Sequence, residues 1–325
     1  MRLYTHATMS DYNVTFAGLP LESPIIIETG DDRLELPVVQ QCIDAGAGGV
    51  LFPSLTEERI RRVTDEDELT EHNRNDRGSR DSERVLRRLN IEEHLERLET
   101  TARESSVPVI ASLQCDRRAQ WFALAQQMKD AGAAAIEIVP YRDETLRNRR
   151  SDHIEKAILR TTAYLADRLE APLIVRIPAF VHGTQTFVQA LGDAGASGIL
   201  LEPSPGFAGV DVESAALTLP GDDKAASHAA FLSLFTVCRT LYRRVGPHIA
   251  MQLTDGSPSS LVTAILGGAS LATVPVPGND PDEAGQSVRR HVGYLKKWMS
   301  AHQADSLFDF RGTLSESRLT SSLEN

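Results

Sequence analysis

One short segment occurs in three close copies along the chain, and it constrains the possible fold more than any other feature. The copies at 44–50, 130–136 and 193–199 share Asp-Ala-Gly-Ala before small and β-branched residues, and 266–272 is a looser copy. In each copy an apolar helical pattern ends at a glycine suited to the left-handed position after a helix, and a β-branched run follows. Repeated helix-to-strand connections indicate a chain built from βα units. We therefore predict an α/β fold, a (β/α)8 TIM barrel, with any chemistry at the carboxyl ends of its strands.

The rest of the sequence supplies the strands and helices that such a barrel needs. Residues 14–16 and 19–21 flank Ala17-Gly18 and predict a short N-terminal hairpin that closes the bottom of the barrel. We expect the fourth helix to begin at Asp152 as its N-cap, and the seventh near Ser257-Pro258, a serine cap followed by proline. The expected strands are 24–27, 49–52, 107–113, 134–139, 173–177, 198–201, 248–253 and 271–274. The expected helices span about 34–44, 90–104, 119–131, 152–169, 225–244 and 282–302, with one ending near 194 and one beginning near 257.

Long loops are expected after the second and sixth strands. The first, 56–88, is densely charged and has little apolar periodicity, and the second, 204–223, contains Gly, Pro and Asp. One interpretation of the charged segment is a solvent-exposed loop, and the other is a lid over the site or a contact within an oligomer.

Length and charge restrict the class of protein. The 325 residues suit one barrel, and a net charge of −11 argues against nucleic-acid or anionic-membrane partners. No apolar run approaches the roughly 20 residues of a membrane helix, and the N-terminus lacks the apolar core of a secretion signal. Three scattered cysteines without a CxxC pair indicate a reducing cytoplasm. We divide the chain into a tail at 1–12, a single barrel domain at 13–312 and a tail at 313–325.

Several segments, in this order, carry a resemblance to a known family. They are Val14-Thr-Phe-Ala-Gly-Leu-Pro-Leu-Glu-Ser-Pro24, Leu55-Thr-Glu-Glu-Arg-Ile60, Pro108-Val-Ile-Ala-Ser-Leu113, and a C-terminal group with Trp298-Met, His302, Ser306-Leu-Phe-Asp and Arg311-Gly312. The pattern resembles the dihydroorotate dehydrogenase-like proteins, which are close to class 1 dihydroorotate dehydrogenase, a flavin-binding (β/α)8 barrel. The likeness extends from about Val14 to Gly312.

The residues by which that family holds FMN are mostly replaced. The resemblance implies lysines after strand 2 and on strand 5, asparagines after strands 3 and 4, and a phosphate cradle of a Gly-Gly turn after strand 7 and backbone amides after strand 8. The matching positions here are Pro53, Gln114, Val139, Arg176, Leu253-Thr254 and Val274-Pro-Val-Pro277. Leu253 adds bulk to the turn, and Pro275 and Pro277 each remove an N–H donor. We expect no bound cofactor, with FMN as the alternative.

Arg176 is alone among apolar residues in the fifth expected strand. Its neighbours place it on the face that points into the barrel, where a guanidinium must be paired or bind an anion. One interpretation is a structural ion pair with Glu137 or Glu202. The other is an anchor for the carboxylate or phosphate of a small anionic ligand. Both stay open at this point, and the candidate ligand-binding residues are Arg176, Gln114, Glu137, Glu202, Gln252 and Thr254.

Acidic residues at strand ends raise the possibility of a metal or of acid–base chemistry. Glu28, Glu137, Glu202 and Asp255 lie at or near the ends of strands 1, 4, 6 and 7, where carboxylates could bind Mg²⁺ or act as bases. No spaced metal motif accompanies them, so no metal is expected, and Glu28 and Asp255 are the candidates if one binds.

No catalytic residue is assigned. Schiff-base chemistry is disfavoured because no lysine lies on an expected strand. The resemblance implies a cysteine or serine base on the loop after strand 4, and no residue matches it clearly. The candidates are Cys115, Tyr141, Asp143 and Ser151.

Three functional hypotheses follow. The first is a dihydroorotate dehydrogenase-like barrel with a degenerate FMN site, which does not oxidise dihydroorotate and keeps an anion-binding pocket or serves as a subunit of an assembly. The second is an FMN-dependent oxidoreductase with a rebuilt pocket, and the third is a metal-assisted non-redox enzyme. We also expect a homodimer or larger assembly, with Tyr294, Trp298 and Phe308 as interface aromatics and the charged segment ordered by a neighbouring chain. The alternative is that Trp298 packs the last helix onto the barrel.

Overall fold

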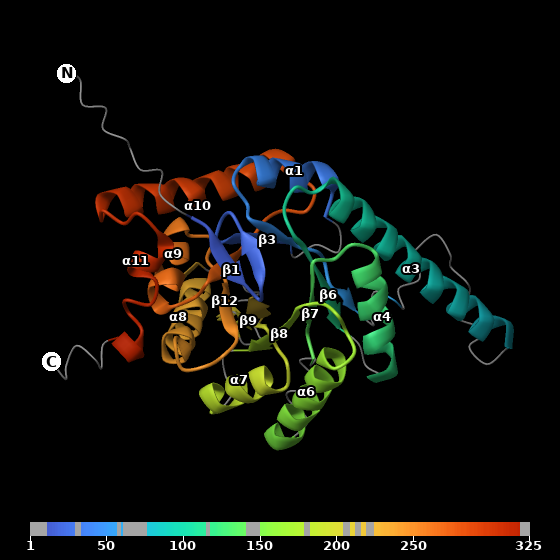
Figure 1. Cartoon of the computed structure of the whole chain (residues 1–325). Helices are drawn as coiled ribbons and strands as arrows, with labels where there is room; N and C mark the ends of the chain where they lie inside the picture. Colours follow the sequence, from blue (N-terminus) through green and yellow to red (C-terminus); the bar gives the residue numbers. More distant parts are fainter. Residues whose placement is uncertain are drawn as a thin grey trace.

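The fold is a closed parallel barrel, as the repeats predict (Figure 1). The computed structural model describes residues 12–29, 34–56, 60, 77–114, 118–140, 150–178, 183–203, 209–211, 216–218 and 224–318. The barrel strands are β3 (Ile25–Glu28), β4 (Gly49–Leu51), β5 (Leu55–Thr56), β6 (Val109–Gln114), β7 (Ala135–Ile138), β8 (Leu173–Pro178), β9 (Gly198–Glu202), β12 (His248–Gln252) and β13 (Leu271–Pro275). Pairing of β4 with β6 closes the circle. β5 continues β4 along β6 after an interruption at 52–54, so these nine segments make eight barrel strands.

The helices surround the strands. They are α1 (Leu36–Asp44), α3 (Arg77–Glu104), α4 (Arg118–Asp130), α6 (Ser151–Ala166), α7 (Thr184–Asp193), α8 (Lys224–Leu241), α9 (Pro258–Gly267) and α10 (Pro281–Ala301), followed by the short α11 (Leu307–Phe310). In Figure 1 helix α10 lies beside α1, so the last helix meets the first around the barrel. No helix in the described part of the chain is long and apolar enough to span a membrane.

The repeated segments form the helix ends that the sequence predicts. The glycines of the four copies have φ values of 102°, 96°, 100° and 115°, in the left-handed region. In each copy the glycine N–H bonds the carbonyl three residues back, and the next N–H bonds the carbonyl five back, as in Gly195 to Gly192 and Ala196 to Leu191. This is the Schellman arrangement, which ends the helix and turns the chain into the next strand. A side chain at Gly195 would also meet the Ala166 Cβ at 2.4 Å.

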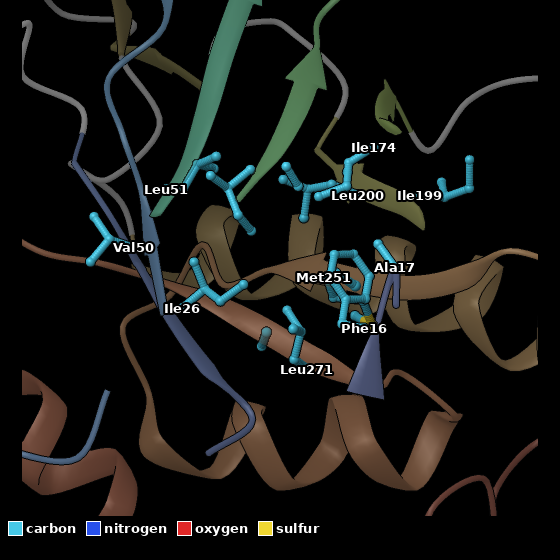
Figure 2. Close-up of a cluster of buried hydrophobic side chains, with 14 of the residues drawn as sticks. Phe16, Ala17, Ile26, Val50, Leu51, Ile174, Ile199, Leu200, Met251 and Leu271 are labelled. Atoms are coloured by element: carbon cyan, nitrogen blue, oxygen red, sulfur yellow. The ribbon is translucent and has the colours of Figure 1, made fainter. Parts of the chain in front are cut away.

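The predicted hairpin closes the amino-terminal end of the barrel. Strands β1 (Val14–Phe16) and β2 (Leu19–Leu21) are antiparallel, and the Ala17 N–H donates to His248 Nδ1 at 2.9 Å. In Figure 1 the hairpin lies in front of the barrel strands, and Figure 2 shows Phe16 close to Met251 and Leu271. The space left between Phe16 and the barrel interior above it is about 10 Å³, too little for more than one water. The lower interior is therefore a packed core.

Two local expectations were wrong. Helix α3 begins at Arg77, so residues 77–88 of the charged segment are helical. Its N-terminal half projects beyond the barrel (Figure 1), where a helix needs no apolar face, and pairs such as Arg88–Glu92, 2.7 Å apart, support it. The 204–223 loop contains an antiparallel pair, β10 (Gly209–Asp211) with β11 (Ala216–Thr218).

The second concerns the N-cap of the fourth helix. Arg150 is the N-cap of α6, with extended backbone, and Asp152 is in the first turn, where its carboxylate still lies near the positive end of the helix dipole. By contrast, Ser257 is the N-cap of α9 with Pro258 next to it, as predicted.

The chain beyond residue 312 also packs onto the barrel. The Leu314 N–H donates to the Leu266 carbonyl, and the Ser315 hydroxyl donates to the Gly312 carbonyl at 2.6 Å. Ser315 is fully buried. Residues up to 318 therefore belong to the packed structure.

Candidate ligand-binding pocket

Arg176 lies at the centre of a polar cluster in the upper half of the barrel. Alternation along β8 directs Ile174 and Arg176 inward, whereas their neighbours face the helices. The Arg176 Nε donates to Glu137 Oε1, Nη2 donates to Glu28 Oε1 at 2.7 Å, and Nη1 donates to Glu202 Oε2 at 3.3 Å. Only 9% of the Arg176 side chain is exposed. The structural ion pair considered from the sequence is thus present, with three carboxyl groups in place of one.

Two more strands support this cluster through Glu28. Its Oε2 accepts hydrogen bonds from the Thr273 hydroxyl at 2.8 Å and from the Gln252 side-chain amide at 3.2 Å. Both oxygens of Glu28 are therefore bonded, and the network joins β3, β7, β8, β9, β12 and β13. Such a network fixes the guanidinium in place and leaves it no freedom to follow a ligand.

The cluster carries a net negative charge at neutral pH. Burial, then the neighbouring charges of Glu137 and Glu28, raise the pKa of Glu202 well above its ordinary 4.5. Burial opposes the charge on Arg176, but Glu137 and Glu28 raise the pKa of the guanidinium further. One guanidinium faces three carboxyl groups, so a net negative charge remains whether or not Glu202 holds a proton.

A cavity of about 260 Å³ lies above the cluster, at the carboxyl ends of the strands. Its floor includes Arg176 and Glu202, and one wall is the interruption of the second strand, where Pro53 cannot donate to a ladder. The lining residues are Glu28, Thr29, Leu51, Phe52, Pro53, Ser54, Thr56, Ser112, Gln114, Val139, Arg176 and Glu202. The lining thus combines polar residues with the apolar side chains of Leu51, Phe52, Pro53 and Val139.

Two buried polar atoms in this region have no hydrogen-bond partner in the described structure. They are Ser112 Oγ, on the cavity wall, and Glu137 Oε2, the oxygen that Arg176 does not contact. Ser112 is 2% exposed and Glu137 is fully buried. Unpaired polar atoms are costly in a protein interior, so they mark a place where a ligand or ordered water would bind.

The structure brings most predicted site residues together. Arg176, Glu28, Glu137, Glu202 and Gln252 form the cluster, and Gln114 lines the cavity. Thr254 is not in the lining, and its hydroxyl donates to the Ser227 carbonyl at 2.6 Å. Cys115, Tyr141 and Asp143 lie outside the described residues, as does the side chain of Ser151, the first residue of α6.

Sequence reasoning missed Ser112 and Thr273. Both occupy inward-facing positions of barrel strands, so the alternation that placed Arg176 could have found them.

The fourth acidic residue, Asp255, has a different place. Its Oδ1 accepts the Ser257 N–H at 3.1 Å, and its Oδ2 contacts the Ser260 hydroxyl at 2.8 Å and His228 Nδ1 at 2.9 Å. The Asp255 side chain is 5% exposed. Its carboxylate therefore occupies the N-terminus of α9, a position that favours an anion.

Several contacts at the strand ends bear on how these residues would meet the phosphate of FMN. The phosphate would lie at the loops after the seventh and eighth strands. There the Leu253 N–H donates to the Thr273 carbonyl and the Val276 N–H to the Glu28 carbonyl, so neither is available to a phosphate. Pro275 and Pro277 have no N–H, and Asp255 adds a negative charge.

Nor do the described residues offer a metal centre. No group of three or more His, Cys, Asp or Glu side chains in the described part of the chain is arranged to hold an ion. The oxygens of Glu28, Glu137 and Glu202 converge instead on Arg176.

Comparisons with known proteins identify the architecture. No protein-family model matches the chain, and no curated protein matches it in sequence. Among solved structures, a glycine-to-alanine mutant of the active chimera of (S)-mandelate dehydrogenase is similar, with a TM-score of 0.59 and 10% identity. The match covers 95% of this chain and 84% of that one. Because 985 solved chains match, the likeness shows the barrel fold and leaves the function to the site.

Proposed function

We propose that the chain is a dihydroorotate dehydrogenase-like barrel that does not hold FMN and binds a small organic ligand in the pocket above Arg176. The observation that carries the proposal is the Asp255 carboxylate at the N-terminus of α9, bonded to the Ser257 N–H and the Ser260 hydroxyl. In this position it takes the donors that a phosphate would use and repels a phosphate through its charge.

The ligand that suits this pocket lacks a negative charge. The sequence left open that Arg176 anchors an anion, but each guanidinium nitrogen already donates to a carboxyl oxygen. An anion would have to bind the N–H groups that remain on the two terminal nitrogens, and it would then lie beside three carboxyl groups in a cluster that is already negative. The cavity of about 260 Å³ limits the ligand to a compact molecule.

Flavin content tests the proposal directly. The chain is purified from its native host, and its absorbance in the flavin bands is measured before and after denaturation. We expect no FMN at or near one per chain, and no change in FMN fluorescence when FMN is added to the protein. A yellow preparation that releases FMN on denaturation would overturn the proposal.

The same measurement decides the second candidate, an FMN-dependent oxidoreductase with a rebuilt pocket. In its favour, Gln114 lines the cavity at the position where the resembling family has an asparagine, and the similar solved structure is named a dehydrogenase. The metal-assisted enzyme is not proposed, because the acidic oxygens at the strand ends are directed at Arg176 or at α9.

A further inference from the structure

Two neighbouring strand segments bring a pair of hydroxyl groups to the same cavity. Leu55 of β5 and Leu113 of β6 are register partners, and Ser54 and Ser112 come directly before them in the chain. Both serines line the cavity of about 260 Å³. Each has a buried hydroxyl oxygen with no hydrogen-bond partner among the described residues, and Ser112 is only 2% exposed. Such hydroxyl groups are costly unless a bound molecule satisfies them.

The same two segments continue with polar side chains. Thr56 and Gln114 are register partners in the parallel pair, and both line the cavity. The two leucines between the polar positions are fully buried and are not part of the lining, as the alternation of side chains along a strand requires. The uncharged polar residues of these segments form a strip along the cavity, made of Ser54, Thr56, Ser112 and Gln114. Every side chain of this polar strip can both donate and accept a hydrogen bond.

The charged groups of the cavity also suit hydroxyl groups. Each nitrogen of the Arg176 guanidinium donates to one carboxyl group, so a second N–H remains on each of the two terminal nitrogens. Arg176 and Glu202 both line the cavity. A ligand hydroxyl can accept from the guanidinium and donate its own proton to a carboxyl oxygen. A carboxylate can only accept, and an ammonium group can only donate, so neither matches both neighbours.

We infer that the cavity binds a small neutral polyol, a single sugar ring or a cyclic polyol, with its hydroxyl groups bound by Ser54, Ser112 and Arg176. The inference rests on the proposed function, since it names the class of ligand for the same pocket. A volume of about 260 Å³ restricts the ligand to a compact molecule. Phe52 and Pro53 come directly before Ser54 and also line the cavity, so they offer apolar contact to the C–H groups of a ring.

Four probes that share a six-membered ring separate the possibilities. D-glucose and myo-inositol are neutral polyols, D-glucuronate carries a negative charge, and D-glucosamine has a positive ammonium group in place of one hydroxyl. Binding to the full-length protein is measured by ligand-detected NMR at increasing probe concentration. We expect at least one of the neutral polyols to bind and glucuronate not to bind. Glucosamine should bind no more tightly than glucose, because its ammonium group cannot accept a hydrogen bond.

Three serine variants locate the bound molecule. Ser54→Ala and Ser112→Ala each remove a hydroxyl group that lines the cavity. Ser270→Ala is the matched control, since it removes a buried hydroxyl group that also lacks a partner but lies at the amino-terminal end of β13. None of these changes removes a side-chain hydrogen bond within the described structure, so all three variants should fold. We expect each cavity variant to weaken polyol binding about fivefold and Ser270→Ala to leave it unchanged.

Three results would overturn the inference. They are no binding of either neutral polyol, tighter binding of either charged sugar than of glucose, and equal effects of the cavity variants and Ser270→Ala. If neither polyol binds and the protein also lacks FMN, ordered water satisfies the two hydroxyl groups, and the inference fails while the absence of flavin stands. If the purified protein holds FMN, the proposed function itself fails.

Discussion

Replacement of Arg176 by methionine is the sharpest test of the polar cluster. Methionine roughly conserves the side-chain volume but leaves three carboxyl groups without their shared cation. The expected loss of stability does not scale with the number of ion pairs that Arg176 makes. The raised pKa of Glu202 favours its neutral form, and Glu28 keeps its bonds from Thr273 and Gln252. The stranded charge is therefore chiefly that of Glu137, and we expect a loss of about 3–5 kcal/mol in the free energy of unfolding, as for one broken buried pair.

The assay is equilibrium unfolding in urea at neutral pH, with Arg103→Met as the matched control. Arg103 is 62% exposed and pairs with Glu104 on the surface of α3. Its replacement should change the free energy of unfolding by less than about 0.5 kcal/mol. Addition of Glu137→Gln to Arg176→Met removes the stranded charge and should restore a large part of the loss, which a pair of independent sites would not do.

Either of two results would refute this reasoning. A loss below about 1 kcal/mol for Arg176→Met would mean that the carboxyl groups do not depend on the guanidinium, as for an exposed pair. A double variant less stable than Arg176→Met alone would mean that Glu137 stabilises the fold by some other contact.

Three further predictions concern protonation and assembly. The pKa of Glu202 is raised in the folded chain, so the wild type should lose stability relative to Glu202→Gln as the pH rises above 4.5 toward the raised value. An unchanged difference in urea midpoints would contradict the raised pKa. Burial, then the charge of Arg311, lowers the pKa of His248, and its Nδ1 accepts the Ala17 N–H. The stability that this bond contributes is therefore present above pH 6.5 and is lost as the pH falls through the lowered pKa. The hydrogen-exchange protection of Ala17, corrected for the intrinsic pH dependence of exchange, should fall over that range, and His248→Ala should remove this change in protection. A homodimer or larger assembly is still expected from Tyr294 and Phe308, 40% and 69% exposed, and a light-scattering mass near 35.6 kDa at micromolar concentration would argue against it. If deletion of 66–80 leaves an assembly intact, the charged segment is not ordered by a neighbouring chain.

One of the predicted interface aromatics has an intramolecular role. Trp298 stacks on His302 with ring centroids 4.0 Å apart and contacts Phe310 with centroids 4.7 Å apart. It therefore packs α10 against α11 within the chain.

The sequence by itself determined the features that depend on neighbouring residues. The glycine of each Asp-Ala-Gly-Ala copy ends a helix because the left-handed position and the two following hydrogen bonds involve only six consecutive residues. The strands, the hairpin and the inward direction of Arg176 follow from periodicity in the same way. The start of helix α3 was predicted too far along the chain, because its first turns lie outside the barrel. A helix there needs no apolar stripe for stability, so the sequence shows no helical pattern.

The tertiary structure decided which groups meet. Arg176 contacts Glu137, Glu202 and Glu28, which are 39, 26 and 148 residues away, and Glu28 bonds Thr273 across 245 residues. No periodicity specifies such partners, because they are set by the closure of the barrel and by the register of strands that come together only when it closes. Asp255 is another case in which the sequence does not specify the partners. A carboxylate that follows a strand can be recognised in the sequence, but its position at the N-terminus of α9 depends on how that loop packs. The barrel is thus set by local pattern, and the charge of its pocket is set by long-range packing.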